Sequence, residues 1–129
     1  MATRQRERIA KRRQEADTRP YAIAKYIGMG SSKAKRLLDL IRGVGYNQAV
    51  AILENADSSN ARDVRKVLLS AGANAENNKG LNKDDLFVAE CFANAGPTLK
   101  RGIFRGKGGH DRILKRTCHI TIILDAVKK

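Results

Sequence analysis

The sequence has few of the features that mark membrane, secreted or organelle-targeted proteins. It contains no apolar run near the length of a membrane span, and no secretory signal follows Met1. The acidic residues Glu7, Glu15 and Asp17 argue against an organelle transit peptide. Cys91 and Cys118 are the two cysteines, and both lie in apolar segments typical of free thiols in a reducing cytoplasm, with a disulfide between neighbouring strands as the alternative. We expect a cytoplasmic protein with no membrane partner.

Motifs of catalysis and metal binding are also missing. The glycine-rich stretch Gly102–Gly109 has three residues rather than four before its Gly-Lys pair, and Gly108 stands where a phosphate loop needs Ser or Thr. His110 and His119 have no partner at metal-ligand spacing, and no nucleophile lies beside a base in a motif. We therefore predict no catalytic residue, no metal and no cofactor, and a protein that is not an enzyme.

Acidic residues are half as frequent as basic ones, and the excess is concentrated. The chain has 26 Lys and Arg against 13 Asp and Glu, a formal net charge of +13. Residues 1–19 carry +4 and residues 97–116 carry +6, whereas residues 20–96 carry +2. Concentrated positive charge favours a nucleic acid or an anionic membrane as partner. Without a membrane signal, nucleic acid is the better interpretation.

Hydrophobic periodicity predicts an α+β fold with three helices packed on a small, mostly antiparallel three-stranded sheet. In the first strand, Tyr21, Ile23 and Ile27 are expected on one face. Gly72 lies inside the third helix, where it lowers stability unless a neighbour packs closely against it. Ser31, Ser32 and Lys33 start the first helix, and they serve either as a plain cap or as a phosphate site. The predicted strands are 21–27, 86–93 and 118–124. The first predicted helix begins near Ser31 and is ended by Gly43 and Gly45, and the other two run over about 47–55 and from 61 towards 78.

Residues 97–116 have too few apolar side chains in their middle to form a core, and we predict that they form an extended hairpin, here called the arm. If the two long strands pair throughout, the arm spans about ten residues a side, roughly 30–35 Å. Residues 20–129 form one domain, and residues 1–19 form a basic extension. The extension is either a solvated tail or a segment that folds along phosphates, and we favour the second. Because Phe104 is the only aromatic residue of the arm, folded RNA read by shape and backbone fits better than base reading.

Several motifs resemble the bacterial-type large-subunit ribosomal protein twenty-two family. They are Asp39-Leu-Ile-Arg-Gly, Asn74-Ala-Glu-Asn-Asn, Gly96-Pro-Thr-Leu-Lys-Arg and Arg112-Ile-Leu-Lys-Arg-Thr-Cys-His-Ile-Thr. The resemblance covers residues 19–124. It implies a small body on the outside of the large subunit and a long hairpin that reaches through ribosomal RNA to line the nascent-peptide exit tunnel. It also implies a role in early subunit assembly, and location in the ribosome of the cytoplasm.

The resemblance and the charge pattern together give a set of expected contacts. The partners are large-subunit ribosomal RNA, neighbouring ribosomal proteins and the nascent peptide, which meets the hairpin tip at Lys107, Gly108, Gly109 and His110. Gly30-Ser31-Ser32, Gly102-Ile103-Phe104 and Gly109 depart from the usual family pattern, so the tip is expected to be less charged and more flexible than is typical. The expected RNA-binding residues are Arg12, Arg13, Lys33, Lys35, Arg36, Lys100, Arg101, Arg105, Lys107, Arg112, Lys115, Arg116 and His119.

Two other functions compete with the ribosomal one. An architectural DNA-binding protein with β-ribbon arms would have a similar layout, but such arms usually carry an apolar wedge at a tip that here is glycine. An RNA-modifying enzyme is disfavoured by the missing catalytic motif.

Overall fold

The computed structural model describes the backbone of residues 2–14 and 17–126, and the side chains of residues 4–12 and 17–126. The chain is α+β, as predicted. Short 3₁₀ turns lie at Lys83–Asp85 and Gly106–Gly108. In chain order the main elements are α1 (Ala2–Gln14), β1 (Tyr21–Ile27), α2 (Ser31–Ile41), α3 (Tyr46–Asn55), α4 (Ala61–Lys79), β2 (Leu86–Ala95), β3 (Leu99–Phe104), β4 (His110–Lys115) and β5 (Cys118–Ala126).

The helix count and the sheet differ from the prediction. The described residues form four α-helices rather than three, because the basic extension itself is helical from Ala2 to Gln14. Its charged sequence has no clear apolar stripe, which is why periodicity gave no helix there. The strands form two sheets rather than one, since β1, β5 and β2 make a three-stranded antiparallel sheet and β3 and β4 make a separate pair.

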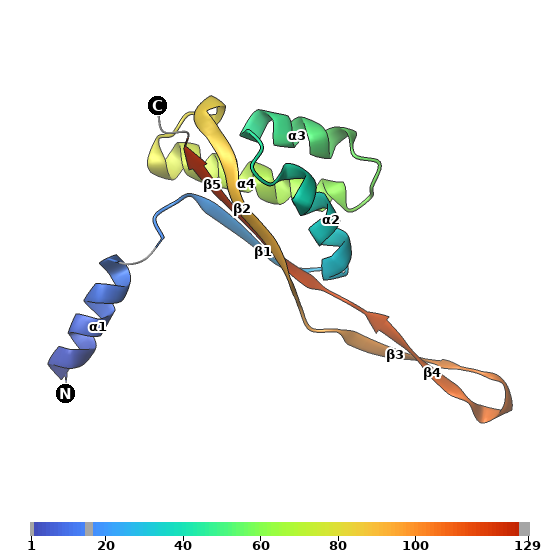
Figure 1. Ribbon diagram of the computed structural model, residues 1–129. Coiled ribbons are helices and arrows are strands. Elements are labelled where there is room, and N and C mark those ends of the chain that lie inside the picture. The colour runs from blue at the N-terminus through green and yellow to red at the C-terminus, as the bar shows by residue number, and fades with distance from the viewer. Residues whose placement is uncertain (1, 15–16, 127–129) are drawn as a thin grey trace.

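The body consists of the three-stranded sheet and the helices α2, α3 and α4, which lie on the same side of it (Figure 1). Helices α2 and α4 pack on the sheet, and α3 packs on both of them. The alternation predicted for β5 is confirmed, because its even-numbered residues face the helices. Among the most deeply buried side chains are those of Leu38, Ile41, Leu68, Ile120, Ile122 and Leu124.

The predicted face of Ile27 is wrong. The register of β1 against β5 shifts between Ala24 and Ile27, and Tyr26 has a φ of +58°. A bulge of this kind inserts an extra residue and reverses the alternation of the side chains after it. Ile27 therefore packs against the core with Ala24, whereas Tyr21 and Ile23 remain on the outer face.

The glycine inside α4 has a close neighbour. A Cβ atom on Gly72 would lie 2.5 Å from both Cζ and Oη of Tyr46. Tyr46 begins α3 and is buried, so its ring fills the space above the bare backbone of α4. Glycine lowers the stability of a helix, but at this position its missing side chain lets α3 and α4 approach each other.

The arm separates from the body at its root. Gly96 N–H donates to the Thr117 carbonyl at 2.8 Å, and the Thr117 hydroxyl donates to the Pro97 carbonyl at 2.7 Å. Pairing resumes at Leu99 with Lys115 and ends at Phe104 with His110. The arm strands are thus six residues each, about 20 Å of strand, and pairing throughout ten residues a side is not observed. The ladder of β2 with β5 ends at Ala95 and Cys118, and the ladder of β3 with β4 begins at Leu99 and Lys115, so the root lies between two separate ladders.

Both cysteines are free and buried. The Cys91 thiol donates to the Leu38 carbonyl at 3.3 Å. Burial raises the pKa of the Cys91 and Cys118 thiols above its ordinary value, so both stay protonated at neutral pH. The two cysteines are therefore structural. A cysteine introduced on the surface would react with a thiol-directed reagent in preference to them.

Candidate nucleic-acid interface

The arm presents cations on both of its faces. Residues paired across an antiparallel ladder share a face, so the pairs Arg101–Ile113 and Leu99–Lys115 lie on one side. The pairs Lys100–Leu114 and Gly102–Arg112 lie on the other. The side chains of all these basic residues are exposed. An arm of this design can neutralise phosphates of two nucleic-acid segments at once, one on each side.

The arm also exposes large apolar side chains. Phe104 is 87% exposed, and Leu99, Ile103 and Leu114 are each about half exposed. A two-stranded ribbon has no second layer that could cover them, so their burial needs a partner. The sequence prediction emphasised the cations and missed this component.

The tip is a closed turn with a lysine at its apex. Arg105 N–H donates to the Gly109 carbonyl at 2.8 Å, and Lys107 adopts the left-handed conformation with φ of +58°. Arg105 also pairs with Asp111 at 2.6 Å, so one predicted RNA-binding cation already has a carboxylate partner. Both side chains are mostly exposed, so the pair contributes little to stability and leaves Arg105 accessible to a partner.

His110 does not project freely from the tip. Its ring lies against the backbone of Gly102, and it packs edge-on to Phe104 with a centroid distance of 5.4 Å. Gly102 is one of the positions that depart from the family pattern, and its missing side chain makes room for this ring. Of the four predicted tip residues, Lys107, Gly108 and Gly109 surround the turn and His110 belongs to the strand below it.

A groove of about 610 Å³ brings the arm root together with the start of α2. Lys33 from α2 and Lys115 and Arg116 from the arm line it. The N-cap of α2 is Gly30, and no side-chain hydrogen bond caps the helix, so the plain Ser cap is not formed. The first N–H groups of α2 and its dipole therefore add to the positive potential of the groove.

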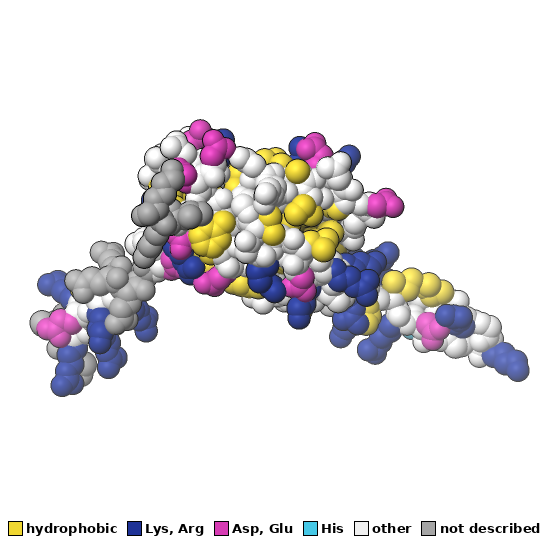
Figure 2. Space-filling model, turned by 45° about the horizontal axis from the view of Figure 1, so that its top comes forward, with side chains coloured by type: hydrophobic (Ala, Val, Ile, Leu, Met, Phe, Trp, Pro, Cys, Tyr) yellow, Lys and Arg dark blue, Asp and Glu magenta, His cyan; other side chains and the backbone are white. Residues whose placement is uncertain are grey.

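Three long segments of the chain, each of which contributes residues near the arm root, contain no acidic residue. Residues 18–38, 91–110 and 112–124 contain no Asp or Glu. Figure 2 shows Lys and Arg side chains gathered over the body where the arm begins. The exposed cations of these segments are Lys25, Lys33, Lys35, Arg36, Lys100, Arg101, Arg105, Lys107, Arg112, Lys115 and Arg116. The fold thus joins most of the predicted RNA-binding residues into one basic surface, which includes Lys25, a residue that the sequence did not single out.

The remaining predicted residues lie elsewhere or are only partly described. Arg12 is exposed on α1, which lies apart from the body in Figure 1. The side chain of Arg13 lies outside the described residues. His119 lies on β5 at the arm end of the sheet, half-buried beside Tyr26. The basic extension and the arm root are therefore two separate positive regions.

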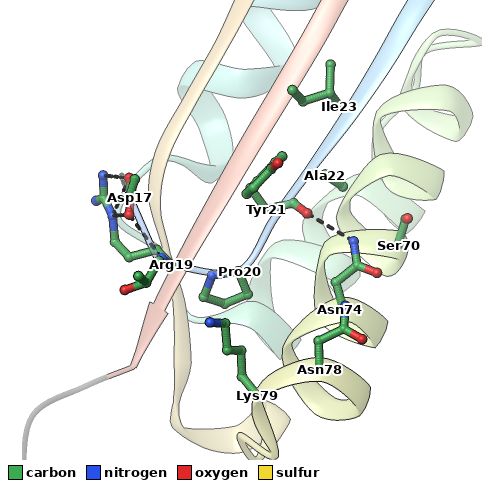
Figure 3. A pocket seen from close by; sticks show the side chains of 11 residues that line it. Asp17, Arg19, Pro20, Tyr21, Ala22, Ile23, Ser70, Asn74, Asn78 and Lys79 are labelled. Atoms are coloured by element: carbon green, nitrogen blue, oxygen red, sulfur yellow. Dashed lines mark hydrogen bonds and ion pairs between the residues drawn. The ribbon is translucent and has the colours of Figure 1, made fainter. Parts of the chain in front are cut away.

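A second groove, of about 620 Å³, lies between β1 and the end of α4 (Figure 3). The Asn74 side-chain amide donates to the Tyr21 carbonyl at 3.0 Å, which anchors the outer edge of β1 to α4. Arg19 pairs with Asp17 at 2.6 Å and with Glu90 at 2.8 Å. Its hydrogen bonds lower the pKa of the Asp17 carboxyl to about 2. These contacts hold the start of β1 in place, and the groove has fewer cations than the arm root.

The described part of the chain offers neither a metal site nor a membrane span. It contains no cluster of three or more His, Cys, Asp or Glu residues that could hold a metal ion. No helix among those residues is long and apolar enough to cross a membrane.

Comparison with known proteins gives a consistent result. Residues 22–125 match the model of the family described as ribosomal protein L22p/L17e. A large ribosomal subunit protein uL22 of Trichodesmium erythraeum is 46% identical over 108 residues, which cover 84% of this chain and 91% of the relative. A uL22 of Cutibacterium acnes is 40% identical over 121 residues, 92% of this chain and 79% of the relative. A uL22c of Porphyra purpurea is 48% identical over 101 residues, 78% of this chain and 87% of the relative.

Proposed function

The chain belongs to the ribosomal protein L22p/L17e family, and on this basis we propose that its arm and arm root bind large-subunit ribosomal RNA and that the arm tip lines the nascent-peptide exit tunnel. As a member of this family the protein is a structural component of the large ribosomal subunit, located with the ribosomes of the cytoplasm, and is not an enzyme. The architectural DNA-binding alternative is not proposed, because the family is ribosomal.

The single observation that supports RNA binding best is the groove at the arm root, which is lined by Lys33, Lys115 and Arg116 and by no acidic residue. Lysine and arginine release counterions when they neutralise packed phosphates, and the released ions drive the association. The two-sided arm then bridges RNA segments, while its exposed apolar side chains become buried between them. This bridging is the contribution that we propose to subunit assembly, together with contacts to neighbouring ribosomal proteins.

The tunnel position is tested by a photo-cross-linker attached to Lys107→Cys. Because the native thiols are buried and protonated, the new cysteine is the one that reacts at neutral pH. We expect cross-links from position 107 to a radiolabelled nascent chain in stalled ribosomes. Asn78→Cys, exposed near the C-terminal end of α4 and remote from the arm, is the control and should give none. Absence of nascent-chain cross-links from position 107 in subunits that contain the variant would refute the tunnel assignment.

The RNA-binding role of the arm root is tested by salt dependence. Lys115→Ala and Arg116→Ala should each weaken binding to large-subunit RNA and reduce the slope of log K against log salt by about 0.7–0.9. Lys79→Ala, exposed at the end of α4, should leave the slope unchanged. The measurement is filter binding of the full chain over a series of salt concentrations. An unchanged slope in the first two variants would mean that their side chains remain solvated on the RNA.

A further inference from the structure

We infer that Tyr26 and His119 form a stacking site for one unpaired nucleobase of the ribosomal RNA, on the open face of the body sheet. This inference rests on the proposed RNA-binding function and extends it from phosphate contacts to a base contact. The open face is the side of the β1–β5–β2 sheet opposite α2, α3 and α4, and no described element covers it.

The Tyr26 ring is held outward by an uncommon backbone conformation. Aromatic residues seldom adopt a positive φ, and Tyr26 has φ of +58° within the bulge of β1. Bulges often re-aim a side chain at a functional site. Tyr26 is 65% exposed as a residue, so the bulge presents an aromatic side chain to the outside instead of burying it.

His119 is fixed beside this ring by three contacts. The Tyr26 backbone N–H donates to His119 Nδ1 at 2.9 Å, and the two rings meet edge-on with centroids 4.8 Å apart. The third contact is the bare backbone of Gly96, where a Cβ would lie 3.3 Å from the His119 ring. Because Nδ1 accepts a hydrogen bond, the neutral imidazole carries its proton on Nε2. The site thus combines a stacking surface with a hydrogen-bond donor of fixed position.

Charge and location favour RNA over a protein as the occupant. Lys25 precedes Tyr26 in the sequence. Arg116, which lines the basic groove at the arm root, lies three residues before His119. The segments that surround the site contain no acidic residue. Aromatic side chains flanked by cations and a hydrogen-bond donor are the usual means of holding a base that has left its helix. Tyr21, Ile23 and Phe92 extend the exposed apolar surface along the sheet.

The test uses the full chain and deproteinised large-subunit RNA. Tyr26→Leu keeps an apolar side chain but removes the ring, and loss of one stacked base should weaken binding about 5- to 100-fold. Tyr26→Phe keeps the ring and should bind within twofold of the parent. The salt slope should be the same in both variants, because no cation is changed. Equal affinities of the two variants would overturn the inference.

A photo-reactive benzoylphenylalanine at position 26 identifies the occupant in assembled subunits. We expect an adduct that ribonuclease removes and that maps to an unpaired nucleotide. A protein adduct would overturn the inference and assign the open face to a neighbouring protein. The absence of any adduct, with the variant incorporated and the salt slope of Lys115→Ala reduced as expected, would also overturn it while leaving the proposed function intact. If the proposed function itself were wrong, Lys115→Ala would instead leave the salt slope of RNA binding unchanged.

Discussion

Replacing residues 99–115 with an Asn-Gly turn is expected to leave a folded body that binds large-subunit RNA roughly 10³–10⁴-fold more weakly at 0.15 M salt. The deleted segment carries six of the exposed cations. If each cation makes one phosphate contact, the loss of all six reduces the slope of log K against log salt by about 4–5. At about 0.15 M salt, a change in slope of this size corresponds to the stated loss of affinity. No core residue comes from the arm, and the two sheets share no ladder, so the body should retain its stability.

The deletion needs a control that separates charge from shape. An arm of full length with the same six cations replaced by Gln keeps both faces and the apolar side chains. We expect it to bind more tightly than the deletion and with the same reduced salt slope. Thermal unfolding followed by circular dichroism checks the body, and filter binding gives the affinities. A body that unfolds, or an affinity that is nearly unchanged, would contradict the division of the chain into body and arm.

Gly72→Val is expected to lower the free energy of unfolding by about 3 kcal/mol, a fall in Tm of roughly 10–15 °C. A Cβ at this position enters the space of the Tyr46 ring, and the ring is buried, so the side chains cannot separate without shifting α3 away from α4. Gly72→Ala should cost less, because the gain in helix propensity of about 1 kcal/mol partly offsets the overlap.

A double-mutant cycle isolates the cause of this loss. Tyr46→Leu removes the ring atoms that the new side chain would meet, so Gly72→Val in that background should cost much less than in the parent. Ser70→Ala, on an exposed position of the same helix, should change stability by less than about 0.5 kcal/mol. Denaturant unfolding gives the four free energies. Additive effects of the two substitutions would show that Tyr46 is not the reason for the glycine.

Features encoded by neighbouring residues were predictable. The strand over residues 21–27, the helix over residues 31–41 and the alternation of Ile120, Ile122 and Leu124 follow from side-chain periods of 2 and 3.6 residues. The arm could also be located, since its charge and glycine content differ from those of the body. The helix over residues 2–14 was not predicted, because a highly charged segment lacks the apolar stripe that marks a helix in a sequence.

Contacts between distant residues could not be read in this way. The bulge that turns Ile27 inward and Tyr26 outward, and the position of His119 beside Tyr26, depend on which strands pair and in which register. The close approach of Tyr46 to Gly72 depends equally on the packing angle of two helices.

The sequence by itself determined the α+β class, the basic arm and the family, because these depend on composition, on local periodicity and on motifs that stay recognisable without coordinates. Only the tertiary structure decided that Lys33, Lys115 and Arg116 share one groove and that two aromatic rings meet on the open face of the sheet. The physical reason is that charge and periodicity are sums over neighbouring residues. A binding surface, in contrast, is a set of distances between residues that lie up to about ninety positions apart in the chain.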